Sequence, residues 1–318
     1  MKTKRKLKKN IKKGIYLFIA LIIVILVIFG LVKYIEYRNS YPYKLEKIGY
    51  KKDQIELILK LDDQNIDDIL KRKYNKKIIS FIKQKYFIYS NLDEYLEYYN
   101  KNKDRKLEDV VAIVNVKTNY EPYDEDIVTK TDVSKKELML VNKYHYLTKD
   151  YSPKDIVSIS NYYAYGDNEI KELVYKQFKK MWNAAKQEDL TLIITSSYRD
   201  YEFQDNLWNS RADTYGEEVA DSGTARAGFS EHQTGYTLDI VTYNSQLNDF
   251  ENTDEFKWLQ NNAHKYGFIL RYPKDKEEIT GYDYESWHYR YVGEETATKI
   301  KKLGITYDEY YAYFLENH

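Results

Sequence analysis

The stretch GFSEHQTGYTLDI, Gly228 to Ile240, brings a histidine, a glycine and an aspartate close together. His232 precedes Asp239 by seven residues, which span roughly 23 Å in an extended strand. Two ligands of one tetrahedral zinc ion lie only about 3.4 Å apart. If both side chains bind one metal, the chain must turn back between them, and Gly235 permits this because glycine tolerates positive φ. The motif therefore predicts two neighbouring short strands, each offering one ligand.

A second stretch, YESWHYRYVG, supplies the other parts of a catalytic metal site. His288 can be a third neutral nitrogen ligand, which leaves the fourth position for water, as in catalytic zinc sites. Glu285 stands three residues before His288 and is placed to take a proton from that water and deliver it to a leaving amine.

A third stretch, SSYRDYEFQ, follows a predicted strand. The fixed positive charge of Arg199 could stabilise an oxyanion or bind a carboxylate, and Gln204 could hydrogen-bond to substrate. Each residue alone is more often an ordinary surface residue, and it is the order of the three stretches within one region that favours an active site.

Other polar residues are interpreted as structural. His264 lies near a predicted helix C-terminus, where a polar or positive side chain is favourable without a metal. His145 is also expected to be structural. Glu231, beside His232, is expected on the opposite face of a strand and in contact with solvent.

The charge of the chain is unevenly distributed. It has 318 residues with 50 basic and 50 acidic side chains, and eight of the basic ones lie in the first 13 residues, which contain no acid. The remainder is therefore mildly acidic, and we expect no nucleic-acid partner. The chain has no cysteine, which excludes disulfides and thiolate metal sites.

Ile15 to Val32 is a run of 18 residues without a charge. A helix of that length spans roughly 27 Å, close to the ~30 Å hydrocarbon core of a membrane. A cleaved signal peptide is the alternative, but the following KYIEYRNSYPYK has no small-residue cleavage site. We predict an uncleaved transmembrane helix over 14–33, a basic cytoplasmic tail over 1–13, and an extracellular remainder.

The rest of the chain divides into two parts. Residues 34–105 carry apolar side chains at helical spacing and predict a helical spacer or accessory domain, with partner or wall binding as the alternative. Residues 106–318 mix predicted strands, including Val110–Val116, with helices, including an apolar stripe from Ile170 to Ala185 and a helix capped by Thr253. This pattern predicts an α+β domain.

Together, SSYR…Q, SEHQTGYTLDI, YGFILRYP and ITGYDYESWHYRYVG resemble the VanY-type D-alanyl-D-alanine carboxypeptidases. This zinc peptidase family includes L,D-carboxypeptidases of peptidoglycan and is related to VanX dipeptidases and the hedgehog domain. The resemblance runs from Leu140 to Gly293 and leaves out the membrane helix and residues 34–105. It implies a small antiparallel sheet with flanking helices.

The resemblance also implies roles for individual residues. It implies zinc (Zn2+) held by His232, Asp239 and His288, with Glu285 as catalytic base and Arg199 stabilising the scissile carbonyl. Gln204 and Ser230 would help to hold the end of the peptide.

Three positions depart from the family pattern. Ser197 stands where the family usually has Gly, Thr237 where Ala is common, and Ser286 where Pro is usual. None of them is a ligand or the base, so activity is expected to survive, while Ser197 and Ser286 could alter loop shape and substrate choice.

The expected function is that of a membrane-anchored zinc carboxypeptidase that removes terminal D-alanine from peptidoglycan stem peptides. An L,D-carboxypeptidase acting on tetrapeptide stems and an endopeptidase cutting cross-links are alternatives within the fold. A non-catalytic, zinc-containing wall-binding module is an alternative of another class. Glu285 argues against it, because a binding module needs no proton-transfer carboxylate beside a ligand.

Overall fold

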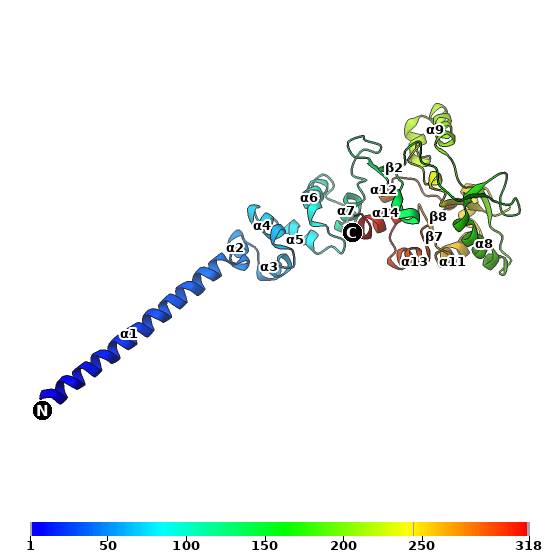
Figure 1. Cartoon of the computed structure of the whole chain (residues 1–318). Helices are drawn as coiled ribbons and strands as arrows, with labels where there is room; N and C mark the ends of the chain where they lie inside the picture. The colour runs from blue at the N-terminus through cyan, green and yellow to red at the C-terminus, as the bar shows by residue number, and fades with distance from the viewer. Residues whose placement is uncertain (1, 244, 317–318) are drawn as a thin grey trace. The chain divides into compact units, whose positions relative to one another are not determined.

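The computed structural model describes residues 2–243 and 245–316. The chain forms two compact units, one extending to Leu96 and the other beginning at Glu97 (Figure 1). The finer division of the chain at residues 13, 33 and 105 stays a prediction.

The first unit begins with a single long helix, α1, Lys2–Asn39. Its segment Lys12–Asn39 is long and apolar enough to cross a membrane, and none of that apolar stretch is buried against other parts of the protein. This is consistent with the predicted single-pass anchor, and the helix extends beyond the predicted span at both ends.

Short helices follow α1, as the spacing of apolar residues predicts. They are α2 (Tyr41–Ile48), α3 (Lys52–Ile58), α4 (Asp63–Lys71), α5 (Lys76–Ile82), the 3-10 helix η1 (Tyr89–Asn91) and α6 (Leu92–Lys101). Leu45, Ile58 and Ile69 lie in one buried cluster shared by these helices. Asp62 and Asn75 cap α4 and α5 by accepting hydrogen bonds from backbone N–H groups of the first turn.

The second unit is built around a four-stranded antiparallel sheet with the order β5-β6-β8-β7. Its strands are β5 (Ile193–Ser196), β6 (Thr237–Val241), β7 (Phe268–Leu270) and β8 (His288–Tyr291). All five residues of β6 are buried, which suits a central strand.

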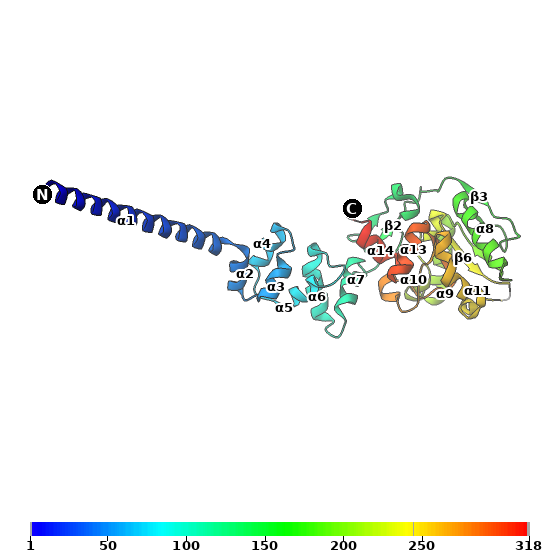
Figure 2. The same cartoon turned by 90° about the horizontal axis from the view of Figure 1, so that it is seen from below.

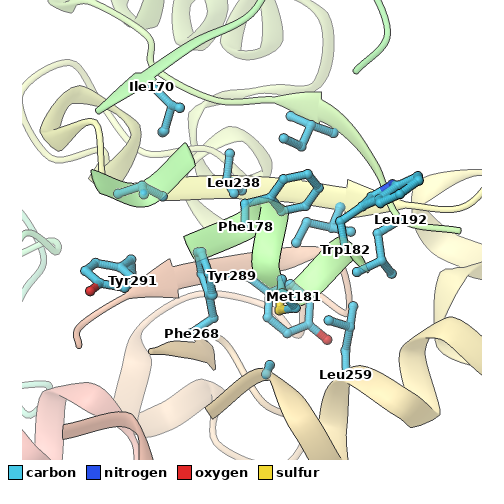
Figure 3. Packing of buried hydrophobic residues seen from close by; sticks show 14 of the residues in the cluster. Ile170, Phe178, Met181, Trp182, Leu192, Leu238, Leu259, Phe268, Tyr289 and Tyr291 are labelled. Atoms are coloured by element: carbon cyan, nitrogen blue, oxygen red, sulfur yellow. The ribbon is translucent and has the colours of Figure 1, made fainter. Parts of the chain in front are cut away.

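Helix α8, Glu172–Lys186, packs its apolar stripe into the main core. Figure 3 shows Phe178 and Met181 of this helix among buried side chains of the sheet, including Leu238 and Tyr289. Leu173, which the sequence pattern places in the same stripe, is exposed. Helix α11, Asp254–Asn262, is capped by Thr253 as predicted.

The remaining elements complete the second unit. The strands are β1 (Thr129–Lys130), β2 (His145–Tyr146), β3 (Ile156–Ser158) and β4 (Glu169–Lys171). The helices are α9 (Tyr201–Tyr215), α10 (Glu217–Gly223), α12 (Glu277–Thr280), α13 (Glu294–Leu303) and α14 (Tyr307–Phe314), with the 3-10 helices η2 (Val133–Leu138), η3 (Glu231–Thr234), η4 (Leu247–Asn252) and η5 (Ala263–Tyr266). Figure 2 shows α13 close to α14, where Ala297 and Tyr307 share a buried cluster.

The strand predicted at Val110–Val116 is wrong, because this segment belongs to helix α7, Leu107–Asn115. Every residue from Val110 to Asn115 is buried. A segment that is apolar all round has no periodicity that separates a helix from a strand, and its β-branched residues favoured the wrong choice. Glu108 and Asp109 in the first turn are typical of a helix N-terminus.

Candidate active site

Two of the predicted ligands lie opposite each other on adjacent strands. Asp239 of β6 pairs directly with His288 of β8, and Asp239 also pairs with Ser196 at the end of β5. Directly opposed residues of antiparallel strands point to the same face. His288 Nδ1 therefore lies 3.4 Å from Asp239 Oδ1.

The third predicted ligand, His232, lies on the 3-10 helix η3 and not on a strand, which corrects the prediction of two ligand-bearing strands. Gly235 ends η3 with a φ of 72°, so the expected turn is present. A Cβ on Gly235 would also lie 2.9 Å from Lys171 Cγ. The turn brings His232 Nε2 to 3.5 Å from Asp239 Oδ1.

These three side chains fit a metal ion in number, type and spacing. His232, Asp239 and His288 each offer one ligand atom, and the three atoms lie within 4.8 Å of one another. His232 Nε2 and Asp239 Oδ1 are buried and have no hydrogen-bond partner among the described residues. Two imidazoles and one carboxylate, with the carboxylate oxygen 3.4 and 3.5 Å from the two ring nitrogens, form a donor set that zinc takes in catalytic sites.

The carbonyl group of Ser197 controls which nitrogen His232 presents to the metal position. His232 Nδ1 lies 2.5 Å from the carbonyl oxygen of Ser197. A carbonyl can only accept, so Nδ1 carries the proton and Nε2 presents its lone pair to Asp239 and the metal position. Burial lowers the pKa of His232 to about 4, which keeps the ring neutral.

Glu231 is buried, and the prediction that it would be exposed is wrong. Its Oε1 accepts a hydrogen bond of 2.7 Å from Arg271 Nε and lies 3.1 Å from Arg290 Nη1, and its Oε2 lies 3.5 Å from His288 Nε2. The prediction assumed the alternating faces of a strand, whereas the 3-10 helix turns consecutive side chains in other directions. The sequence signal was the pair of arginines, Arg271 directly after β7 and Arg290 within the fully buried strand β8.

Glu285 lies in the loop that precedes β8, with Oε2 3.1 Å from His288 Nδ1. Burial raises the pKa of Glu285, and the neighbouring His288 offsets part of that rise. A carboxylate with a raised pKa is a stronger proton acceptor, so Glu285 is suited to general base chemistry beside the three ligands.

The site opens into a cleft of about 330 Å³, which is lined by the three ligands, Glu285, Arg199, Gln204 and Ser230. Arg199 Nε is buried without a hydrogen-bond partner in the described part of the chain. Burial lowers the pKa of Arg199, although Asp239 and Glu285 oppose that shift. A poorly solvated cation next to the metal position can stabilise negative charge that develops on a substrate.

Gln204 and Ser230 line the cleft, and both also make contacts within the protein. Gln204 Nε2 donates a 2.7 Å hydrogen bond to the Ala225 carbonyl, and its Oε1 has no partner among the residues described. Ser230 Oγ accepts a 3.4 Å hydrogen bond from the backbone N–H of His232 and so caps η3.

The three departures from the family pattern lie close to the site. Ser197 Oγ donates to Asn168 Oδ1 over 2.8 Å and accepts from the Glu169 N–H over 3.1 Å. Thr237 and Ser286 are fully or almost fully buried. Of the other histidines, His145 is buried and His264 is partly exposed, and neither belongs to the three-residue donor cluster.

Comparison with known proteins agrees with this geometry. A family profile described as VanY, D-alanyl-D-alanine carboxypeptidase, matches residues 167–294. The chain is 40% identical over 181 residues to YodJ of Bacillus subtilis, covering 55% of this chain and 66% of YodJ. It is 36% identical to a D-alanyl-D-alanine carboxypeptidase of Enterococcus faecium, covering 60% of this chain and 63% of the relative. These matches therefore span slightly less than two thirds of the relatives' length.

A shorter relative is matched almost throughout. The bifunctional D-Ala-D-Ala dipeptidase and carboxypeptidase VanXYC of Enterococcus gallinarum is 32% identical, covering 56% of this chain and 95% of the relative. The structure of the LdcB LD-carboxypeptidase superposes with a TM-score of 0.56 at 36% identity, covering 61% of this chain and 94% of that chain. The chain belongs to the VanY family of D-alanyl-D-alanine carboxypeptidases.

Proposed function

We propose that this protein is a zinc-dependent carboxypeptidase that removes the terminal D-alanine from peptidoglycan stem peptides. The observation that carries the proposal is the convergence of His232, Asp239 and His288 with Glu285 beside them, in a cleft that also contains Arg199. Three protein ligands and one proton acceptor are the minimum for metal-assisted hydrolysis of an amide.

In this proposal His232, Asp239 and His288 hold the zinc ion. When bound, zinc polarises the scissile carbonyl and makes water more acidic. Glu285 takes the proton from the attacking water and passes it to the nitrogen of the departing D-alanine. Arg199 offsets the negative charge that develops on the carbonyl oxygen, and Gln204 and Ser230 help to hold the end of the peptide.

Two specificities are compatible with the site. We favour a D,D-carboxypeptidase, which cuts the pentapeptide stem, because the family profile and the enterococcal relative carry that description. An L,D-carboxypeptidase, which cuts the tetrapeptide stem, is the second candidate, because the LdcB LD-carboxypeptidase is structurally similar. The stereocentre before the scissile bond distinguishes the two substrates.

We further propose that residues 14–33 anchor the protein in the cell membrane. The apolar helix supports the anchor, and the eight basic residues before it support a cytoplasmic N-terminus. The catalytic unit then faces the cell wall, where peptidoglycan lies.

We also propose that residues 34–105 act as a helical spacer. Deletion of these residues tests whether they also set the distribution of the protein in the membrane.

The direct test measures D-alanine release from synthetic pentapeptide and tetrapeptide stems, with and without a metal chelator. We expect release from the pentapeptide that the chelator abolishes and added zinc restores. Release from the tetrapeptide alone would establish the L,D alternative, and cleavage of cross-linked muropeptides would establish an endopeptidase. If neither stem is cleaved although zinc is bound, the protein is a non-catalytic wall-binding module.

A further inference from the structure

Four charged side chains form a closed, buried group behind His288. We call Glu231, Arg271, Arg290 and Asp308 the Glu231 network, and each of them is at most 2% exposed. Arg271 joins the two acids, because its Nε donates to Glu231 over 2.7 Å while Nη1 and Nη2 donate to Asp308 over 2.5 and 3.0 Å. Arg290 Nη1 lies 3.1 Å from Glu231.

The network has no net charge, since two arginines face two carboxylates. This balance matters because an unpaired charge at such depth is strongly destabilising. Burial alone would raise the pKa of Glu231, but Arg271 and Arg290 outweigh burial and hold it well below its usual range. The guanidinium groups of Arg271 and Arg290, 2.7 and 3.1 Å from Oε1, thus face a carboxylate that lies next to His288.

The two oxygens of Glu231 have different surroundings. Oε1 faces both arginines, whereas Oε2 has no hydrogen-bond partner within the described ranges and lies 3.5 Å from His288 Nε2. The opposite edge of the same ring points into the site, with Nδ1 3.4 Å from Asp239 Oδ1 and 3.1 Å from Glu285 Oε2. The imidazole thus has a carboxylate on its outer nitrogen and the donor cluster on its inner nitrogen.

A neutral imidazole carries one proton, so a ring that uses Nδ1, on the side of Asp239 and Glu285, as a metal ligand must carry that proton on Nε2. Glu231 Oε2, 3.5 Å from Nε2, is the acceptor for that proton, which favours this tautomer and makes Nδ1 more basic. We propose that Glu231 is the positioning residue of the metal site, which holds His288 with its proton on Nε2. This inference rests on the metal site of the proposed function.

The C-terminal helix contributes to this arrangement. Asp308 belongs to α14 and lies beyond residues 167–294, where the family profile matches. Its bidentate pair with Arg271, together with a 2.9 Å hydrogen bond from Asn142 Nδ2, fixes the arginine that in turn holds Glu231. The positioning of His288 therefore depends on a helix outside the matched region.

The variant Glu231→Gln gives a sharp test, because Arg271 and Arg290 require an acceptor at Oε1. The amide oxygen of glutamine must take that place, so its NH2 group faces His288 Nε2. A donor there favours the proton on Nδ1, where it blocks the metal. We expect the Kd for zinc to rise roughly 10–100-fold, measured by competition with a chromophoric chelator on the full-length chain in detergent.

Two further variants separate positioning from folding. Glu231→Asp keeps the carboxylate acceptor, and we expect it to recover part of the zinc affinity lost in Glu231→Gln. Glu309→Gln removes another buried acid, which caps α14 through the Thr306 N–H, and we expect lower thermal stability with unchanged zinc affinity. Wild-type zinc affinity in a folded Glu231→Gln would overturn the proposal, as would an equal loss of affinity in Glu309→Gln.

A measurement on the wild-type protein decides the question even if the variants do not fold. Ring-15N NMR of the five histidines in the zinc-loaded chain reports which nitrogen of His288 carries a proton. We expect a proton on Nε2 and none on Nδ1, and the reverse would overturn the proposal. A wild-type chain that binds no zinc would instead contradict the proposed function.

Discussion

Asp239 and His288 are direct partners on adjacent antiparallel strands, and this pairing sets the spacing of two predicted metal ligands. The ladder of backbone hydrogen bonds holds the two residues opposite each other without help from a metal. His232 joins them from a short 3-10 helix, and its ring is fixed by the Ser197 carbonyl. Ligands held on rigid elements favour a site that is already formed before zinc binds.

Replacing Glu285 with glutamine should remove the proton acceptor and leave the three ligands in place. We expect the rate of D-alanine release to fall by about 10²–10⁴-fold while one zinc ion per chain is retained. Stem-peptide hydrolysis and metal analysis on the same sample check both statements. Glu295→Gln, at an exposed position of α13, is the matched control and should keep the wild-type rate. A fully active Glu285→Gln would exclude this residue as the base.

Replacing Arg199 with glutamine should weaken stabilisation of the transition state more than substrate binding. We expect kcat to fall by about 10²–10³-fold with a smaller change in KM. Arg211 lines the same cleft but is exposed, so Arg211→Gln should lower kcat by only a few fold. Steady-state kinetics on the preferred stem peptide compare the two variants. Equal losses of kcat would show that the cleft needs positive charge in general and not Arg199 in particular.

Ser197→Ala separates the side chain of this residue from its backbone. The variant loses the Oγ hydrogen bonds with Asn168 and the Glu169 N–H, so we expect the free energy of unfolding to fall by about 1–2 kcal/mol. The contact with His232 Nδ1 comes from the carbonyl group, so zinc affinity should stay at the wild-type value. Denaturant unfolding and zinc competition provide the two measurements. A large loss of zinc affinity would mean that the hydroxyl, and not only the carbonyl, holds His232.

His145 predicts a pH dependence of stability away from the active site. Its ring is buried, contacts Asn142 Oδ1 over 3.1 Å and packs edge-on against Tyr311. Burial lowers its pKa to about 4 in the folded chain, from about 6.5 when unfolded, while the more distant Glu316 and Lys117 act in opposite directions. Unfolding therefore takes up a proton below pH 6.5, and stability falls as the pH drops from 6.5 toward 4.

We expect His145 to contribute about 2 kcal/mol to the loss of stability between pH 7 and pH 5. The measurement compares wild type with His145→Gln in denaturant unfolding at both pH values, with zinc removed. The stability of the variant should decline less steeply by that amount. His264→Gln is the control and should change the slope less, because His264 is partly exposed. Parallel pH profiles of wild type and His145→Gln would contradict the prediction.

The sequence predicted those helices that show a clear helical spacing of apolar residues or an N-cap residue. Helix α8 follows from its apolar stripe, and α11 follows from the N-cap Thr253. The family resemblance led to the antiparallel sheet, because pairing between β6 and β8 joins residues 49 to 53 positions apart in sequence and leaves no local signal. Helix α7 was missed because its run Val110–Val114 is apolar at every position and so shows no period.

At the candidate site, the sequence predicted the three ligands but gave the wrong position for Glu231. The ligands were predicted because the three stretches follow one another within one region and resemble the motifs of the VanY-type carboxypeptidases. Glu231 was misplaced because its direction depends on whether residues 231–234 form a strand or a 3-10 helix, and that depends on tertiary packing. Its partners, Arg271 and Arg290, come from the residue after β7 and from β8, so only the folded chain brings them together.

Anomalous diffraction at the zinc edge, from crystals grown with zinc, tests the central claim most directly. The account predicts one strong peak at about 2.0–2.1 Å from His232 Nε2, His288 Nδ1 and a carboxylate oxygen of Asp239. A peak bound to other residues, or to His288 through Nε2, would contradict it, and so would the absence of any peak between these three side chains.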